Sequence, residues 1–431
     1  MTNVTRRQFL QKSTMAAAGA AAAVTFPSVT GQAQSKFTIN VGLIGCGGRG
    51  SGALSNVLEA GKVAGVTVRV VALADAFQDR LENARARYRK MGVDVPASRC
   101  FHGFDAYRKL VSIPEINYVM MATPPGFRPW HFEEAIRHGK NVFMEKPVGV
   151  DGPGIRRVFA AADEATRKGL SVVAGTQRRH QKGYIETIKR IQDGAIGEIK
   201  ALRAYWNGGA IWHRGGDPNT IEGQLRNWYH YVWFCGDHIV EQHVHNLDVC
   251  NWIMGAHPIR AYGQGGRQAL GPNVTGMKWD HFAVEYEYPN GVRMFSQCRQ
   301  ISRTDSRVSE AATGTKGESN PGGSIVTADG KRWRFRGRAL NPYVQEHVDL
   351  INAIRSGKPV NEGRQVAEST LTAILGRESA YSGKIISWDQ MLNSKRELMP
   401  KELNSDMAEE LKWKITAPKP VVPIPGIYKF A

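Results

Sequence analysis

The sequence predicts an α/β protein that opens with a doubly wound parallel sheet, and three observations carry this prediction. Residues 37–44 form an apolar, β-branched run, which is typical of a parallel strand covered on both faces. The motif Gly45-x-Gly47-x-x-Gly50 follows directly, and residues 51–60 after it have the pattern of a helix. Further apolar strands then alternate with helices, which is the order of elements in a Rossmann-type sheet.

The glycine loop is the first candidate binding site. Gly45 permits the tight turn, Gly47 lets the backbone approach phosphate groups, and Gly50 allows the helix to pack closely on the strand. Gly48 and Arg49 lie in the same loop, where free N–H groups and the helix dipole favour an anion. The loop therefore predicts a site for the pyrophosphate of a dinucleotide.

The residue that follows the second strand bears on which dinucleotide binds. Residues 66–74 form an apolar strand that runs into Asp75. A carboxylate there accepts hydrogen bonds from a ribose 2′-hydroxyl, and it would repel a 2′-phosphate. We therefore predict NAD, while Gln78 and Arg80 nearby leave NADP open.

The third predicted strand covers residues 116–123. It leads into a loop at Thr123 and Pro124, which we expect to pass near the nicotinamide ribose. A helix predicted over residues 128–138 follows, and it carries His131 as a further expected cofactor contact.

The fourth predicted strand, residues 139–144, runs into Glu145-Lys146-Pro147. Ligands collect at the carboxyl ends of strands in open parallel sheets. We therefore expect Glu145 to contact the cofactor and Lys146 to point at its reactive end. A cation in that place indicates hydride chemistry on an alcohol.

The sequence resembles the Gfo/Idh/MocA family of sugar and inositol oxidoreductases, named after glucose-fructose oxidoreductase and inositol dehydrogenase. The resemblance covers residues 36–390 and rests on residues 41–50, Asp75, Thr123-Pro124-Pro125 and Glu145-Lys146-Pro147. It implies a Rossmann domain followed by an α/β domain with a large, open, mostly antiparallel sheet. The exposed face of that sheet commonly supports oligomers, so a dimer or tetramer is expected.

The N-terminus predicts export. Arg6 and Arg7 belong to a twin-arginine signature, an alanine-rich stretch follows over residues 15–24, and residues 31–33 offer a small-residue cleavage site. The apolar stretch is too short and too alanine-rich to span a bilayer well. We expect a periplasmic or exported protein with no integral membrane segment once the signal is removed. Because free nicotinamide cofactors are scarce outside the cytoplasm, we also expect a tightly bound cofactor.

The chain accordingly divides into four parts. They are a signal peptide (1–33), a Rossmann domain (36–155), a substrate and oligomerisation domain (156–395) and an extended, proline-rich tail (396–431). The tail is expected either to wrap a neighbouring subunit or to be a loose end. Helices over residues 343–382 are expected to pack back on the Rossmann domain.

The second domain is expected to carry the acid–base chemistry. A helix over residues 240–254 occupies the place of the family's catalytic helix, with Glu241 and His245 where an Asp and a His are usual. A spacing of four puts both on one helix face, so Glu241 can orient the imidazole and raise its basicity. His245 is then the expected general base, and Lys146 is expected to stabilise the developing alkoxide.

His243 lies between these two residues and has two interpretations: a second acid–base group, or a packed histidine. His238, Glu241, His243 and His245 are of the residue types that commonly bind zinc, and three of them could form a zinc site if they converged. Two residues turn a helix by about 200°, so His243 leaves the face that Glu241 and His245 share. No metal is predicted.

Substrate contacts are expected from two places. Arg178 and Arg179 follow an apolar strand over residues 170–174, and Tyr184 opens the next helix; the alternative is a pair of solvated surface arginines. Trp212 belongs to an aromatic-rich, glycine-broken region in which rings can stack on the C–H faces of a sugar. Core packing is the alternative for these aromatic residues.

Two local patterns complete the second domain. Strands over residues 279–288 and 292–298 are linked by a Pro-Asn-Gly turn, and residues 314–323 are expected to form a polar loop.

The five cysteines show no CxxC spacing, so no disulfide framework is predicted. The net charge of +18 is dispersed and lacks a nucleic-acid motif, which favours a carbohydrate partner over a nucleic acid.

Three functions follow from these features. The first is an exported NAD(P)-dependent oxidoreductase that acts on a hydroxyl of a sugar or sugar derivative. The second is a redox-neutral glycosidase that oxidises, eliminates, adds water and re-reduces; against it, Gln242 stands where redox glycosidases of this superfamily carry Tyr. The third is a non-catalytic saccharide-binding protein, which Lys146 and His245 argue against.

Overall fold

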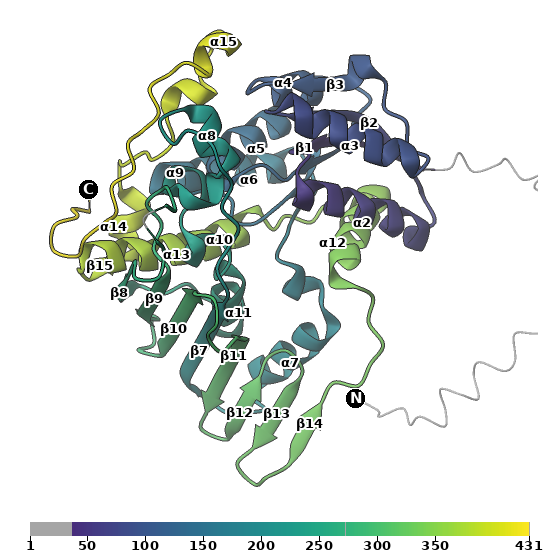
Figure 1. Ribbon diagram of the computed structural model, residues 1–431. Helices are drawn as coiled ribbons and strands as arrows, with labels where there is room; N and C mark the ends of the chain where they lie inside the picture. Colours follow the sequence, from purple (N-terminus) through teal and green to yellow (C-terminus); the bar gives the residue numbers. More distant parts are fainter. Residues whose placement is uncertain (1–36, 272, 431) are drawn as a thin grey trace, which may run out of the picture. The chain divides into compact units, whose positions relative to one another are not determined.

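The computed structural model describes residues 37–271 and 273–430, so the predicted signal peptide over residues 1–33 lies outside the described residues. Two sheets organise the described chain (Figure 1). In these two stretches, no helix combines the length and apolar character that crossing a membrane requires.

The first sheet has six strands, all parallel, in the order β3-β2-β1-β4-β5-β6. The strands are β1 (Thr38–Ile44), β2 (Thr67–Asp75), β3 (Cys100–His102), β4 (Tyr118–Met121), β5 (Asn141–Met144) and β6 (Val172–Ala174). The helices between them are α2 (Gly48–Ala64), α3 (Gln78–Lys90), α4 (Ala106–Val111), α5 (Arg128–Arg137) and α6 (Gly152–Arg167). The strand order reverses beside β1, which creates the crevice where such sheets bind ligands.

This sheet confirms the predicted Rossmann fold. Strands β1 and β2 agree with the runs at residues 37–44 and 66–74, and the inner residues of both strands are buried. Helix α2 begins at Gly48, earlier than predicted, because the turn at the glycine loop is completed by Gly47 as the N-cap. Strand β6 lies beyond residue 155, so the parallel sheet extends into the part of the chain that the sequence assigned to the second domain.

The second sheet has nine strands in the order β14-β13-β12-β11-β7-β10-β9-β8-β15. They are β7 (Ile199–Gly208), β8 (Arg260–Gly266), β9 (His281–Glu287), β10 (Arg293–Gln300), β11 (Arg307–Gly314), β12 (Gly317–Asn320), β13 (Ser324–Thr327), β14 (Arg332–Arg334) and β15 (Ile386–Ser387). Only β7 and β10 pair in parallel, and the other neighbours are antiparallel. The expected open, mostly antiparallel sheet is therefore present.

Two local predictions for this sheet have opposite outcomes. The hairpin predicted over residues 279–298 is confirmed as β9 and β10. The polar loop predicted over residues 314–323 is wrong, because this stretch contains β12, which pairs with both β11 and β13. A strand of an antiparallel sheet with one solvated face need not be apolar, so composition alone concealed it.

Longer helices join the two sheets. These are α7 (Lys182–Gln192), α11 (Val244–Met254), α12 (Pro342–Ser356) and α13 (Gly363–Ser382). Helix α12 packs against α2, and α13 packs against both α6 of the Rossmann domain and β8 of the second sheet, so both helices return to the Rossmann domain as expected. The short helices are α8 (Ile221–Arg226), α9 (Val232–Cys235), α10 (His238–Glu241), α14 (Trp388–Asn393) and α15 (Glu409–Lys412), and the 3-10 turns are η1 (Ala97–Arg99), η2 (Pro125–Phe127), η3 (Gln177–His180), η4 (Trp228–His230) and η5 (Lys401–Asn404).

The single helix expected over residues 240–254 is two helices, α10 and α11, with a break at Gln242 and His243. The backbone N–H groups of both residues donate to the same carbonyl, that of His238, at 2.9 and 3.2 Å. One of these bonds skips five residues, which is the geometry of a π-type insertion. The inserted residue rotates α11 relative to α10, so the i,i+4 argument for Glu241 and His245 no longer holds.

The tail, described over residues 396–430, packs against its own chain. The indole Nε1 of Trp279 donates to the carbonyl of Pro423 at 3.1 Å, and the hydroxyl of Tyr428 donates to Glu378 at 2.8 Å. In Figure 1 the yellow tail leaves α14, reaches α15 beside α8 and returns to the C-terminus.

Candidate active site

The glycine loop has the shape that a dinucleotide requires. Gly45 adopts φ +94°, and a Cβ atom there would meet the backbone of Ala122 at 2.7 Å. A Cβ atom at Gly50 would clash with the carbonyl oxygen of Gly45, whereas one at Gly47 would meet nothing within 4 Å. Gly45 and Gly50 are therefore required by the fold, whereas the open space at Gly47 is left for a ligand.

The start of α2 provides donors for a phosphate group. Its N-cap is Gly47, which offers no side-chain cap, and its first turn has no acidic residue. The first N–H groups of a helix have no partner within the helix, and they attract an anion together with the helix dipole. The residues present thus fit the pyrophosphate expected at this loop.

Asp75 holds the loop in place. Its carboxylate accepts hydrogen bonds from the backbone N–H of Cys46 at 2.6 Å and from that of Phe77 at 2.9 Å. Burial raises the pKa of Asp75, and these two hydrogen bonds oppose that rise. A carboxylate has about four acceptor positions, so capacity for a ribose hydroxyl is left.

A groove of about 130 Å³ runs from the loop along the sheet edge. Thr123, Pro124 and His131 line it, as the sequence predicted. The ring of His131 stacks on Tyr107 with centroids 4.1 Å apart, and its Nδ1 lies 3.3 Å from the hydroxyl of Thr123. Burial lowers the pKa of His131 to about 3, so its imidazole is neutral.

A larger cleft of about 780 Å³ begins at the same loop and continues to Lys146. Of the residues predicted for chemistry or substrate, the cleft brings together Lys146, Glu241, His245 and Trp212. Tyr229, from the aromatic-rich region that the sequence singled out, also lines it, as do Gln177 and Gln242, which sequence reasoning missed as site residues. The signal for Gln177 was present, because it precedes the two arginines that the sequence singled out.

Lys146 is only 8% exposed, and its ammonium group is held by Glu241. The Nζ atom donates to the backbone carbonyl of Glu241 and lies 3.2 Å from its side-chain Oε1. The other carboxylate oxygen of Glu241 makes no hydrogen bond of normal geometry with the described chain. The hydroxyl of Tyr229 is close enough to feel this carboxylate. Burial and the charge of Glu241 raise the pKa of the hydroxyl well above its usual range.

The expected pairing of Glu241 with His245 is corrected by this geometry. The carboxylate is committed to Lys146, and Nδ1 of His245 is buried without a hydrogen-bond partner in the described chain. Burial and the positive charges of Lys146, Arg178 and Arg49 lower the pKa of His245 well below its usual value. Its basicity is therefore reduced, not raised, and the ring is neutral; it stacks on Trp206 with centroids 5.8 Å apart.

Two arginines fix the loops around Lys146. Arg128, which the sequence did not single out, is buried and donates to the carbonyls of Pro147 and Thr123, so it ties the two loops together. Arg49 lies 2.5 Å from Glu145 and 3.3 Å from Glu346 of α12. Arg49 and Glu145 both line the cleft, but their charged groups pair with each other.

His243 is a packed histidine, which corrects the hypothesis of a second acid–base group. It is fully buried, its Nε2 lies 2.7 Å from the hydroxyl of Ser296, and its Nδ1 lies 3.3 Å from Asn246. It does not line the cleft. The reason is the helix break, which turns His243 towards the second sheet.

Arg178, Arg179 and Tyr184, the three residues predicted to contact substrate from the strand over residues 170–174 and the helix after it, all bind buried carboxylates. Arg178 pairs with the buried Glu310 at 2.6 Å, and the hydroxyl of Tyr184 donates to the same carboxylate at 3.0 Å. Arg179 makes a bidentate pair with the buried Asp248, with distances of 2.9–3.1 Å. None of the three lines the cleft, and the two arginines are paired with buried carboxylates, so they are not solvated surface arginines.

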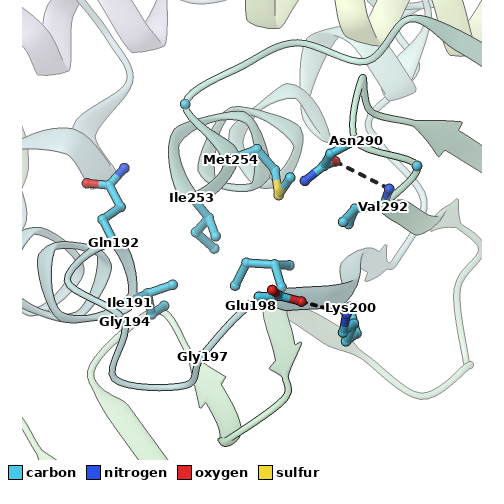
Figure 2. Close-up of a pocket in the computed structure, with 13 residues that line it drawn as sticks. Ile191, Gln192, Gly194, Gly197, Glu198, Lys200, Ile253, Met254, Asn290 and Val292 are labelled. Atoms are coloured by element: carbon cyan, nitrogen blue, oxygen red, sulfur yellow. Dashed lines mark hydrogen bonds and ion pairs between the residues drawn. The ribbon is translucent and has the colours of Figure 1, made fainter.

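Two further features bear on the chemistry. Among residues 37–271 and 273–430, no three His, Cys, Asp or Glu side chains are placed to hold a metal ion. A separate hollow of about 730 Å³ shares no lining residue with the cleft (Figure 2). Its charged residues, Glu198 and Lys200, pair with each other at 2.9 Å, so it offers no free acid–base group.

Comparison with known proteins identifies the family to which the two domains are similar. Residues 39–173 match the family model described as the Gfo/Idh/MocA oxidoreductase family, NAD-binding Rossmann fold, and residues 184–319 match the Gfo/Idh/MocA C-terminal domain. An inositol 2-dehydrogenase from Gluconacetobacter diazotrophicus is 25% identical over 75% of this chain and 88% of its own length. A glycosyl hydrolase family 109 protein from Streptomyces niveus is 29% identical, but the match covers only 45% of this chain and 37% of that protein.

Among solved structures, the scyllo-inositol dehydrogenase from Lactobacillus casei with bound NAD(H) and scyllo-inositol has a similar fold. The TM-score is 0.63, at 19% identity, over 82% of this chain and all of the other.

Buried neutral histidines make stability depend on pH. The pKa of His243 is lowered to about 3 by burial, below the value of about 6.5 in an unfolded chain. The unfolded state therefore binds the extra proton first, so stability is complete above pH 6.5 and is lost as the pH falls towards 3. Between pH 6.5 and 4.5 the free energy of unfolding should fall by up to about 1.4 kcal/mol per pH unit more in the wild type than in His243→Gln. Urea denaturation at several pH values measures this; equal slopes would contradict it.

Proposed function

Because this chain belongs to the Gfo/Idh/MocA oxidoreductase family, we propose that it is an NAD-dependent enzyme that oxidises or reduces a hydroxyl of a sugar or sugar derivative. One observation carries the proposal: Lys146 and His245 line the same cleft as Gly47 and Gly48 of the dinucleotide loop. An ammonium group and a neutral imidazole thus lie in the continuation of the cofactor site.

The residues of the cleft have distinct roles in this proposal. When bound, the nicotinamide ring would accept a hydride from the substrate carbon. His245 takes the hydroxyl proton, and we assign this to Nε2 because Nδ1 is buried. Lys146 stabilises the developing alkoxide, and Glu241 holds the ammonium group in place. Trp212 and Tyr229 supply aromatic walls for the C–H faces of a sugar.

The proposal includes export and a retained cofactor. The twin-arginine pattern at Arg6 and Arg7 supports export to the periplasm. Retention is supported by the chemistry of that compartment, where a dehydrogenase that exchanged its cofactor in each turnover would stall. Asp75 supports NAD over NADP, because it lines the groove at the end of β2 and a carboxylate there repels a 2′-phosphate.

A redox-neutral glycosidase is the second candidate, and the partial similarity to the family 109 protein favours it. The cleft supports it less well. That reaction needs an additional acid–base group, and His243, which the sequence offered for it, is buried against Ser296. A non-catalytic saccharide-binding protein would have no use for a buried, paired Lys146 beside His245.

The central test is to denature the purified mature protein and assay the released nucleotide, then to give the native protein sugars and aryl glycosides without added cofactor. We expect about one NAD per chain, which one sugar reduces and another reoxidises, as followed by absorbance. Catalytic release of aryl alcohol without net reduction would establish the glycosidase instead. A protein that neither contains nor takes up a dinucleotide would contradict both.

Lys146→Met should lower kcat by about 10²–10³, the usual cost of removing one group that stabilises an oxyanion. The bound nucleotide should remain, because the glycine loop is unchanged. Lys200→Met, in the separate hollow of Figure 2, is the matched control and should retain full activity. Steady-state kinetics with the substrate identified in the central test measure kcat for both variants. Equal losses of kcat in the two would contradict the role assigned to Lys146.

The lowered pKa of His245 sets the pH dependence of the reaction. An imidazole with a pKa well below 6.5 stays neutral, and able to accept a proton, as the pH falls through that value. We therefore expect kcat/KM for oxidation to remain level from pH 8 to pH 6. An acidic limb centred near pH 6.5, lost in His245→Asn, would show instead that the group titrates normally.

A further inference from the structure

The C-terminal tail passes over one end of the dinucleotide groove. It leaves α14, reaches the turn between β3 and α4 at α15, and returns to the end of α13 (Figure 1). There the N–H of Gly426 donates to the carbonyl of Ser382 at 3.2 Å. The sequence of sheet strands shows which end this is: Lys146 follows β5 on one side of β1, whereas Asp75 ends β2 on the other. In folds of this kind the acidic residue at the end of this strand binds the adenosine ribose. The tail therefore covers the adenosine end of the groove.

The first wall at this end is held by Glu409. Its carboxylate accepts hydrogen bonds from the backbone N–H of Phe104 at 2.7 Å and of Asp105 at 3.1 Å. Lys412, which is fully buried, lies 2.7 Å from the carboxylate of Asp105. Gly103 and Phe104 line the groove, and a Cβ atom on Gly103 would meet Glu409 at 2.6 Å. The turn is therefore shaped to receive this glutamate.

The aromatic face of the same wall is backed by Trp413. Its ring centroid lies 4.4 Å from that of Phe104 and 5.5 Å from that of Phe77. Both phenylalanines line the groove next to Asp75. The indole Nε1 donates to Glu409 at 3.0 Å, so the two tail residues act as one unit.

The opposite wall belongs to the second domain and is held by the same tail. Leu225 and Trp228 line the groove from α8 and η4. The neighbouring Gln224 is fully buried, and its amide donates to the carbonyl of Pro418 in the tail at 2.8 Å. Its amide oxygen accepts from the indole of Trp233 at 3.1 Å, which fixes the side chain.

We infer that residues 399–418 are a strap that ties the two walls of the adenosine site together and slows the release of the dinucleotide. The inference rests on the proposed function, since it concerns the same cofactor. A bound adenosine leaves only when the turn at Phe104 and helix α8 move apart. The strap opposes this movement because it hydrogen-bonds to the turn through Glu409 and to α8 through Pro418. Glu409 and Trp413 are positioning residues that do not line the groove themselves.

The test measures the rate at which NAD leaves the full-length holoenzyme when it is diluted into a nucleotide trap. Glu409→Ala and Trp413→Ala should each release NAD at least tenfold faster than the wild type. Glu409→Gln, which retains one acceptor oxygen, should give a smaller increase. Tyr428→Phe is the matched control, because it removes a tail hydrogen bond to Glu378 that is remote from the groove, and its rate should be unchanged.

Two half-cofactors separate a local effect from general loosening. The variants should bind AMP at least tenfold more weakly and nicotinamide mononucleotide as tightly as the wild type does, because the strap contacts only the adenosine side. Equal weakening for both halves, or NAD release at the wild-type rate, would overturn the strap while leaving the proposed function intact. A wild type that binds none of these nucleotides overturns the proposed function, and the strap with it.

A measurement on the wild type alone covers the case in which the variants fail to fold. Amide hydrogen exchange at Phe104 and Asp105, whose N–H groups donate to Glu409, should slow when AMP is added. Exchange in residues 409–413 should slow with it. Exchange that AMP does not alter in the tail would overturn the strap.

Discussion

The contact between Lys146 and Glu241 is the constraint on which the site depends. Burying an ammonium group costs several kcal/mol unless a partner of opposite charge compensates it. Strand β5 of the first domain delivers Lys146, and α10 of the second domain supplies Glu241. The two domains therefore cannot separate at this point without leaving a buried charge unpaired. This requirement keeps the cleft, with His245 in its wall, in one shape.

The first half of the molecule could be predicted from the sequence because its requirements are local. The left-handed turn at Gly45, the close approach at Gly50 and the strand end at Asp75 follow from neighbouring residues and the strand–turn–helix pattern. Lys146 was found for the same reason, since it directly follows a buried strand. Arg128 was missed because its role is to join two loops, and that role exists only once the loops are placed.

The second half depends on partners that lie far along the chain. The break after α10 is set by two N–H groups that share the carbonyl of His238, and spacing alone predicts an unbroken helix there. Arg178 and Arg179 were read as substrate contacts because they follow a strand. Their actual partners, Glu310 and Asp248, come from β11 and α11, which no local pattern places beside them. An unbroken helix puts Glu241 and His245 on one face, and the pairing predicted from it is wrong because α11 is rotated relative to α10.

The charges around His245 have opposing effects that together suit the proposed reaction. Burial and the positive charge of Lys146 lower the pKa of His245, which weakens the imidazole as a base. The same charge stabilises the alkoxide that forms as the proton leaves, so less basicity is needed. Pairing His245 with Glu241 would have strengthened the base but removed the partner of Lys146. The structure pairs the buried lysine with Glu241, and it leaves the histidine neutral.

A groove closed by the tail raises the question of how a dinucleotide enters it, and the order of the chain answers it on the proposed function. The glycine loop, Asp75 and Lys146 all lie within the first 146 of the 431 residues, whereas the strap begins at residue 399. Domains form as units, the N-terminal one first during synthesis. The Rossmann sheet can thus bind the dinucleotide before Glu409 and Trp413 reach the turn at Phe104. Docking of the tail then completes the site, and on the proposed export route the folded protein carries its cofactor with it.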